Sequence, residues 1–385
     1  MILFLLGLVN CNKYEDYMKI GFKTQMEMKT DVLWPCGWWL SANVVTQVAR
    51  YEEITGDRSA VSALDNLYEG AKSQYEGNFI NDYYDDNGWW GLAWIDTYQI
   101  TGTTKYLDMA KTIFKQMTSG WDTTNKCKGG LFWKKNPLSY KSAISNSLFN
   151  LLSSRLYEIT GDKSYSDWFI KSMNWFFDSG IIDGTNMVKD GLNDDCNPTG
   201  QCYTYNQGCC IGSLIMATRL TGNNAYLAKA EQIAQASMKT LVVDGVLSDI
   251  NEGTSGDGEE FKGPFIRHFG ELYRTTNKDI YKDFILKCAD SIIEKDYDAT
   301  TKSFGAHWYG PFVKKSSVAN SVALECLQEA YDITNDSCGV YDKSSYTCQQ
   351  GQLCPIINGE AYKNCNGACY SDKIYKCVNG ALQQI

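Results

Sequence analysis

The sequence predicts an all-α fold, an (α/α)6 barrel that is followed by a small disulfide-rich C-terminal module. Three observations support this prediction. A short phrase that ends in Thr-Gly or Thr-Asn recurs six times, apolar residues at helical spacing follow the phrase, and cysteines cluster near the C-terminus. The chain has 385 residues, of which 44% are hydrophobic and 21% are charged, as is typical of a folded globular protein.

The recurring phrase indicates the ends of six equivalent helices. Its copies occupy residues 51–56, 98–102, 157–161, 218–222, 273–277 and 331–335, and their threonines are 46 to 61 residues apart. This spacing accommodates two helices and two loops per repeat, and a Gly or Asn after the last apolar position can close a helix in the left-handed conformation. Six helical hairpins form either an open solenoid or a closed toroid. We favour the toroid because six is its number of hairpins and no polar capping repeat stands at either end of the series.

Three regions are expected along the chain: residues 1–20, 21–337 and 338–385. The apolar residues 1–9 have the length of a secretory apolar region and are too short to cross a bilayer, so residues 1–20 are interpreted as a signal peptide or N-terminal segment. A buried N-terminal strand is the alternative. The barrel is expected in residues 21–337. Six of the fifteen cysteines fall in the last region: Cys338, Cys348, Cys354, Cys365, Cys369 and Cys377.

Cysteine content and charge restrict the environment and the partners of the protein. Fifteen cysteines favour a secreted, extracellular protein, and Asn335-Asp336-Ser337 is a glycosylation sequon. The net charge of −9, without a run of lysines or arginines, disfavours nucleic acid and anionic membrane surfaces as partners. With only two histidines and no zinc, serine-hydrolase or phosphate-loop motif, zinc and serine-hydrolase chemistry are not expected. We expect a monomer.

A closed toroid brings the N-terminal ends of its six equivalent helices to one rim. The segments ahead of these helices combine aromatic with polar residues: 34–39, 83–90, 132–146, 203–208, 261–267 and 304–312. Aromatic faces stack on sugar rings and polar groups bind hydroxyls, so this rim suits a carbohydrate. The alternative is that the large aromatic residues only pack the top of the barrel. The substrate-binding candidates are Trp133, Asp194, Asp195, Tyr205, Asn206, Gln207, Arg267 and Trp308.

The candidate catalytic residues are Asp85 and Asp86, which precede Gly88-Trp89-Trp90. Glycoside cleavage needs one ionised and one protonated carboxyl group, and two adjacent acids in an aromatic setting can differ in pKa through repulsion and desolvation. An ordinary helix N-cap is the alternative. The acidic residues 190–195 could instead bind hydroxyls, supply a catalytic acid or form a turn. Calcium is a further alternative there, although the spacing does not match an EF-hand loop.

Four motifs together resemble glycoside hydrolase family 76: residues 85–94, 129–133 with 141–146, 204–208 and 261–267. They occur in the order and spacing of that family, and the resemblance spans roughly residues 30 to 335. It implies an (α/α)6 barrel, endo-acting retaining hydrolysis of α-1,6-mannan without metal or organic cofactor, Asp85 as nucleophile and Asp86 as general acid/base. Retention agrees with adjacent carboxyl groups, since retaining enzymes place the two about 5–5.5 Å apart. Ser142 departs from the asparagine expected after the lysine.

Two further functions and one further module are considered. The resemblance includes fungal enzymes thought to transfer glycan anchors onto wall polymer, but the final residues lack a hydrophobic anchor signal, so a free hydrolase is expected. A non-catalytic mannan-binding protein is the other alternative, and in each case the partner is a polysaccharide. Two related phrases at residues 346–353 and 375–382 resemble small carbohydrate-binding modules of fungal glucanases. A purely structural disulfide knot is the alternative for them.

Overall fold

The computed structural model contains two compact units. It describes residues 12–253, 256–335, 345–349, 352–357, 360–365, 368–378 and 381–384. The larger unit is Tyr17–Glu329, and the smaller one contains the described residues 12–16 and those from Ala330 onward. Each unit is considered by itself below.

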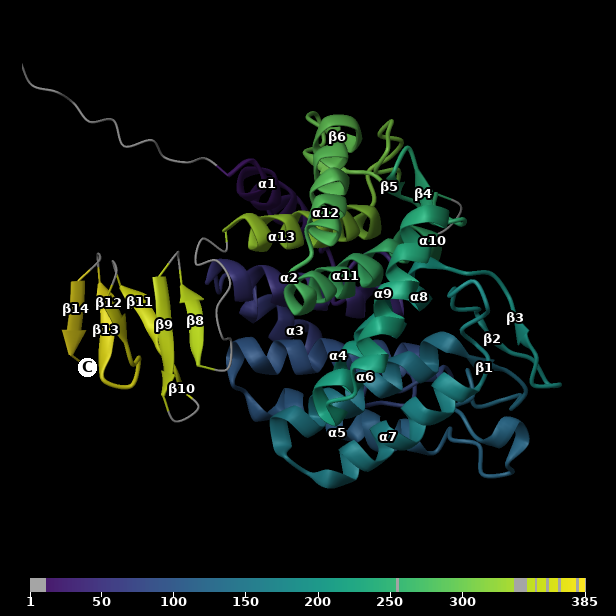
Figure 1. Cartoon of the computed structure of the whole chain (residues 1–385). Coiled ribbons are helices and arrows are strands. Elements are labelled where there is room, and N and C mark those ends of the chain that lie inside the picture. Colours follow the sequence, from purple (N-terminus) through teal and green to yellow (C-terminus); the bar gives the residue numbers. More distant parts are fainter. Residues whose placement is uncertain are drawn as a thin grey trace, which may run out of the picture. The chain divides into compact units, whose positions relative to one another are not determined.

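In the described part of the chain, twelve long helices, six inner and six outer, build the larger unit and extend past its two ends (Figure 1). The inner helices are α2(Trp38–Thr55), α4(Tyr84–Thr101), α6(Ala143–Thr160), α8(Thr204–Thr221), α11(Lys262–Thr276) and α13(Ser317–Asn335). The outer helices are α1(Lys13–Glu27), α3(Val61–Ala71), α5(Thr104–Thr118), α7(Lys163–Asp178), α9(Asn224–Thr240) and α12(Asp279–Ser291). A short helix, α10(Gly256–Glu260), precedes α11. Helices α2, α4, α6 and α8 are buried around most of their circumference, as expected of an inner ring.

The repeated phrase ends the inner helices, as the sequence predicts. Gly56, Gly102, Gly161 and Gly222 take the left-handed conformation directly after α2, α4, α6 and α8, and Asn277 does so after α11. Each donates its backbone N–H to a carbonyl four residues earlier and thereby satisfies an otherwise open end of the helix. Glycine reaches this conformation without steric cost, which explains its use at four of these five ends.

Hydrogen bonds between the last and the first helices close the ring. The side-chain amide of Asn320 on α13 donates to the carbonyl of Gly21 at 3.1 Å and to Gln25 Oε1 at 2.8 Å, both on α1. The Gln328 amide donates to the carbonyl of Gln47 on α2 at 3.0 Å. An open solenoid has no contact between its first and last repeats, so these bonds confirm the closed toroid.

The N-terminal boundary differs from the sequence expectation. Helix α1 begins at Lys13, and its Met18 and Phe22 are buried, so the boundary expected at residue 20 falls inside a barrel helix. The physical reason is that α1 supplies the outer partner that the sixth inner helix needs to cover its apolar face. Residues 1–11, which carry the apolar stretch interpreted as a signal peptide, lie outside the described residues.

Short strands connect the loops at the rim of the barrel. Strands β1(Lys141–Ser142), β2(Gly191–Leu192) and β3(Pro198–Thr199) form an antiparallel sheet in the order β1-β2-β3. It joins the loop before α6 to the loop before α8, and the Cys127–Cys196 disulfide and the Lys126–Asp194 ion pair add two further links. Two hairpins, β4(Val242–Val243) with β5(Val246–Leu247) and β6(Tyr297–Asp298) with β7(Ser303–Phe304), lie later in the chain, and η1(Lys126–Lys128) and η2(Ile292–Asp296) are single turns.

After α13, the secondary structure that the described residues of the smaller unit form consists of strands. These are β8(Tyr346–Gln349), β9(Gln352–Ile357), β10(Glu360–Ala361), β11(Lys363–Cys365), β12(Ala368–Tyr370), β13(Tyr375–Val378) and β14(Ala381–Gln384). Strands β10, β9 and β8 form one antiparallel sheet, and the last four form two hairpins. The Cys354–Cys369 disulfide confirms cross-linking in this region. The boundary expected at residues 337 and 338, Cys338, and the end of the sequon lie outside the described residues.

No helix among the described residues is long and apolar enough to cross a membrane.

Much of the core consists of large aromatic side chains that the two helical layers enclose. Trp34, Trp90 and Trp308 of the rim segments are fully buried, so the packing interpretation applies to these three tryptophans.

Candidate active site

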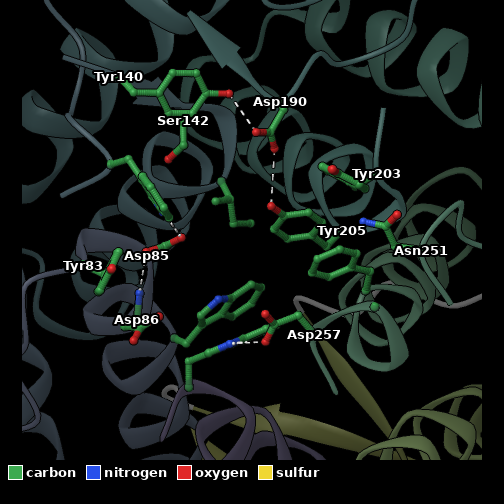
Figure 2. A pocket seen from close by; sticks show the side chains of 16 residues that line it. Tyr83, Asp85, Asp86, Tyr140, Ser142, Asp190, Tyr203, Tyr205, Asn251 and Asp257 are labelled. Atoms are coloured by element: carbon green, nitrogen blue, oxygen red, sulfur yellow. Dashed lines mark hydrogen bonds between the residues drawn. The ribbon is translucent and has the colours of Figure 1, made fainter. Parts of the chain in front are cut away.

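A cavity of about 540 Å³ opens at the N-terminal ends of the inner helices (Figure 2). Its lining residues are Trp39, Tyr83, Asp85, Asp86, Trp89, Trp133, Tyr140, Ser142, Ile144, Asp190, Tyr203, Tyr205, Asn251, Asp257, Gly258 and Phe261. They come from the starts of five of the six repeats, which is the shared rim that a toroid predicts. The sixth rim segment, residues 304–312, contributes none of them.

Asp85 and Asp86 lie in the first turn of α4, directly after Tyr84. Asp85 Oδ2 accepts a hydrogen bond from Trp133 Nε1 at 2.8 Å, and its Oδ1 accepts one from the backbone N–H of Asp86 at 3.0 Å. Asp86 Oδ2 accepts from the side-chain amide of Asn81 at 2.6 Å. The N-cap position belongs to Tyr83, which makes no side-chain capping bond, so the two aspartates are not ordinary caps of this helix.

The two carboxyl groups are electrostatically perturbed as a pair. Burial, followed by the charge of Asp86, raises the pKa of Asp85 well above its usual range, although Trp133 counteracts the rise. Burial raises the pKa of Asp86 to about 6, which Asn81 opposes and the charge of Asp257 supports. The larger rise falls on Asp85, whereas the hydrogen-bond donors and the helix N-terminus favour its ionised form. Two adjacent carboxyls in this setting repel each other when both are ionised, so they titrate as a coupled pair.

A third aspartate, Asp190, forms the opposite wall of the cavity (Figure 2). Its carboxylate accepts a hydrogen bond from the Tyr140 hydroxyl at 2.7 Å and from the Asn206 side-chain amide at 3.1 Å, and the Tyr205 hydroxyl lies 3.5 Å away. Burial and the charge of Asp190 raise the pKa of Tyr140, so this phenol stays a hydrogen-bond donor. The pairing of β1 with β2 carries Asp190 to this place, because the Asp190 carbonyl bonds the N–H of Ala143 at the start of α6.

Aromatic rings form the remaining walls. The Trp39 ring stacks beside Trp89 with centroids 5.9 Å apart, and Tyr205 stacks on Phe261 at 4.2 Å. On the side of the aspartate pair, Trp133 packs against Tyr83 at 5.1 Å. Flat apolar faces next to carboxylates and hydroxyls provide both the stacking and the hydrogen bonding that sugar rings require.

Several residues predicted to bind substrate do not line this cavity. Asp194 and Asp195 are exposed on the loop between β2 and β3, where Asp194 pairs with Lys126. Gln207 instead exchanges hydrogen bonds with the backbone of Val188 at 2.8 Å, and Asn206 contributes only through its bond to Asp190.

Arg267 and Trp308 are also placed elsewhere. Arg267 follows the start of α11 by more than one turn and pairs with Glu325 at 2.6 Å, facing a second cavity of about 380 Å³ between the C-terminal halves of the inner helices. Trp308 has no exposed surface and packs on the buried ammonium of Lys262, with Nζ 4.5 Å from the ring centroid. Both side chains lie outside the cavity that contains the aspartate pair.

Other lining residues were not among the predicted site residues. Trp39, Tyr203 and Phe261 lie within the rim segments identified in the sequence, but nothing in the sequence distinguishes them from the other aromatic residues of those segments. Asn251 lies ahead of α10 and Asp257 lies within this short helix, and neither segment shows a motif in the sequence. Among the described residues, no group of three or more His, Cys, Asp or Glu side chains could hold a metal ion.

Comparison with known proteins agrees with this geometry. Residues 12–347 match the family description "Glycosyl hydrolase family 76". The chain belongs to glycosyl hydrolase family 76. Within that family it resembles the mannan endo-1,6-alpha-mannosidase DCW1 of Saccharomyces cerevisiae, with 28% identity over 218 residues, 52% of this chain and 47% of that protein. The chain thus spans about half the length of the curated relatives that it matches.

Solved structures of the family share the (α/α)6 barrel. The GH76A α-1,6-mannanase from Salegentibacter sp. HEL1_6 superposes with a TM-score of 0.76 at 23% identity, covering 83% of this chain and 99% of that one. A variant of the same mannanase with two consecutive aspartates replaced by alanine, described as inactive, is in complex with α-1,6-mannotetrose.

The C-terminal region of this family 76 member has a separate relationship. Residues 325–382 match the description "Carbohydrate binding". A stretch of 42 residues is 57% identical to part of the primary septum glucan endo-1,3-beta-D-glucosidase of Schizosaccharomyces pombe, which is 11% of this chain and 4% of that protein.

Proposed function

We propose that the protein is a retaining, endo-acting hydrolase of α-1,6-mannosidic linkages in mannan. The observation that carries the proposal is the pair of consecutive carboxyl groups, Asp85 and Asp86, in the first turn of α4, where they open into a cavity with aromatic walls. Membership of family 76 and the relatives named as mannan endo-1,6-alpha-mannosidases support the substrate class.

In the proposed mechanism Asp85 is the nucleophile and Asp86 the general acid/base. The Asp85 carboxylate accepts hydrogen bonds from Trp133 Nε1 and from the N–H of Asp86, and these donors stabilise its negative charge before attack. It attacks the anomeric carbon and forms a covalent mannosyl-enzyme, while Asp86 gives its proton to the leaving oxygen. Water then enters, Asp86 takes its proton, and the second inversion restores the α configuration. Adjacent carboxyls leave little room for a water between Asp85 and the sugar, which supports retention over inversion.

Substrate contacts in the proposal are restricted to side chains that reach the cavity. Of the residues predicted from the sequence, Trp133 and Tyr205 do so. Trp39 and Phe261 add stacking surfaces, and Asp190 adds acceptors for sugar hydroxyls. No organic cofactor or metal takes part in the proposed chemistry.

The test is a digest of linear α-1,6-mannan with wild-type protein, Asp85→Asn and Asp86→Asn. Each variant should lose most of its kcat without unfolding, because it alters a nucleophile or a proton rather than packing. Asp195→Asn is the control, since Asp195 is exposed and outside the cavity. Proton NMR of the first product should show α-mannose before mutarotation. Near-normal turnover by either variant would refute the assignment of the pair, and a first-formed β-anomer would refute retention.

The same digest separates hydrolysis from the two alternative functions. A covalent mannosyl-enzyme can react with a sugar hydroxyl instead of water, so a wall glycan transglycosylase would convert added mannooligosaccharide into longer chains. A non-catalytic mannan-binding protein would release no new reducing ends. Short products with free reducing ends are the expected outcome.

We also propose that residues 338–385 form a carbohydrate-binding module that attaches the enzyme to wall polysaccharide. The match of residues 325–382 to a carbohydrate-binding family supports this, as do the exposed rings of Tyr346 and Tyr375. Full-length protein should sediment with insoluble mannan or β-1,3-glucan, whereas residues 1–337 should stay in solution. Equal sedimentation of both forms would refute the proposal.

A location outside the cell completes the proposed function. The Cys127–Cys196 and Cys354–Cys369 disulfides and the relatives' action on mannan support secretion. Immunodetection in culture medium and wall fractions is the test, and protein found only inside intact cells would contradict it.

A further inference from the structure

We propose that Asp257 is a further functional carboxylate of this site, which acts by keeping the Asp85–Asp86 pair in its singly protonated state. This inference rests on the proposed function, because a singly protonated pair is what retaining hydrolysis needs. Asp257 lines the same cavity as the pair but comes from α10, on a different wall (Figure 2).

The position of Asp257 is fixed relative to the helix that carries the pair. Trp39 Nε1 donates a hydrogen bond to Asp257 Oδ1 at 2.9 Å. The Trp39 ring in turn stacks beside Trp89, which lies one helical turn after the pair on α4, with centroids 5.9 Å apart. The hydrogen bond to Trp39 and the stacking of Trp39 beside Trp89 therefore connect the Asp257 carboxylate to α4.

A buried ion pair also fixes the segment that precedes α10. The buried ammonium of Lys262 lies 2.7 Å from Glu252 Oε2 and donates to the carbonyl of Ala306 at 2.5 Å. Glu252 Oε2 also accepts the N–H of Asp249 at 3.1 Å. A buried pair with these additional hydrogen bonds is costly to open, so it gives α10 a rigid base.

The ionisable residues that line the cavity indicate that Asp257 acts on the pair through its negative charge. The titratable groups that line the cavity with the pair are Asp190, Asp257, Tyr83, Tyr140, Tyr203 and Tyr205. Among the lining residues that the structure describes there is no lysine or arginine. The charge of Asp257 raises the pKa of Asp86, in addition to burial and against the Asn81 hydrogen bond. Removal of the last proton from the pair would place a further negative charge beside Asp257, and repulsion postpones that step to higher pH.

Asp257 could alternatively serve only as an acceptor for a sugar hydroxyl. The two roles differ in their kinetic signature. Loss of a substrate contact raises KM at every pH, whereas loss of a charge that holds the proton moves the basic limb of the pH profile. The pH profile is therefore the decisive readout, and the KM comparison alone is not.

The experiment measures kcat/KM on linear α-1,6-mannan between about pH 4 and pH 9 for wild type, Asp257→Asn, Asp257→Glu and Asp82→Asn. Asp82 is an exposed aspartate close in sequence to the pair but outside the cavity, so it controls for a general loss of charge. Thermal unfolding of each variant checks that it folds.

In Asp257→Asn we expect the basic limb to move to lower pH by roughly half a pH unit, the size expected of one carboxylate acting through a partly solvated cavity. The rate should then fall about threefold above that limb and change little on the acidic side. Asp257→Glu keeps the charge and should keep the wild-type profile. Salt at about 1 M should reduce the difference, because it screens charges separated by a solvated gap.

An unchanged basic limb in Asp257→Asn would overturn the inference, whatever happens to KM, and so would an equal shift in Asp82→Asn. If the wild-type protein releases no sugar from mannan, the proposed function fails. Titration of labelled aspartate carboxyls by carbon NMR, in wild type and Asp257→Asn, still decides the role of Asp257 in that case, because it needs no substrate.

Discussion

Replacement of Lys141 by methionine tests how the wall of the active site is held. The Lys141 ammonium and the Asp122 carboxylate are both almost fully buried, with Nζ 2.6 Å from Oδ2. The ammonium also donates to the carbonyl of Lys126, and Asp122 accepts from Thr124 at 2.7 Å. This ion pair joins the turn after α5 to β1, and the loop between them carries Trp133.

The magnitude follows from the burial of both partners. Lys141→Met keeps most of the side-chain volume but leaves Asp122 without its cation, and breaking a buried pair in this way costs about 3–5 kcal/mol. At about 2 °C per kcal/mol for a domain of this size, the melting temperature should fall by about 6–10 °C at neutral pH.

The pH dependence has a defined sign. Burial raises the pKa of Asp122, but Lys141 and Thr124 outweigh burial and hold this pKa below its usual range. A carboxyl with a depressed folded-state pKa contributes stability that is present above its ordinary pKa, near 3.9, and is lost as pH falls through the folded value. The gap between wild type and Lys141→Met should therefore shrink below about pH 4.

Thermal unfolding at neutral and acidic pH is the assay, with Lys163→Met as the control, because Lys163 is exposed at the start of α7. The double variant Lys141→Met/Asp122→Leu removes both charges and should recover most of the loss. A loss below about 1 kcal/mol in Lys141→Met, or a double variant as unstable as the single one, would refute the reasoning.

Two further predictions concern the packing of α11. Arg267→Met should lower the melting temperature by several degrees, because it leaves the buried Glu325 without its partner at 2.6 Å, while KM for mannan should stay unchanged. A raised KM with an unchanged melting temperature would contradict this prediction and would support the sequence-based interpretation of Arg267 as a substrate-binding residue. Gly208→Ala should cost at least about 1–3 kcal/mol, because its Cβ would lie 2.3 Å from the Phe265 Cα. Gly184→Ala, whose Cβ meets nothing within 4 Å, is the matched control, and equal melting temperatures would contradict the close contact of α8 with α11.

The sequence by itself determined the features that depend on local chemistry. The six phrases predicted the ends of the inner helices, because a glycine or asparagine in the left-handed conformation stops a helix wherever the helix lies. The helical period and the number of repeats predicted the barrel. They also predicted that Asp85 and Asp86 stand at a helix start on the common rim, where the structure places them together.

The tertiary structure alone decided which polar side chains reach the cavity. In the acidic segment 190–195, the pairing of β1 with β2 turns Asp190 into the cavity and leaves Asp194 and Asp195 in solvent. Asp257 lines it from the short helix α10, whose sequence shows no motif, and its place depends on a hydrogen bond to Trp39, more than two hundred residues earlier in the chain. Contacts of this kind join segments that are distant in sequence, so no local propensity or period encodes them; only the closure of the ring brings them within bonding distance.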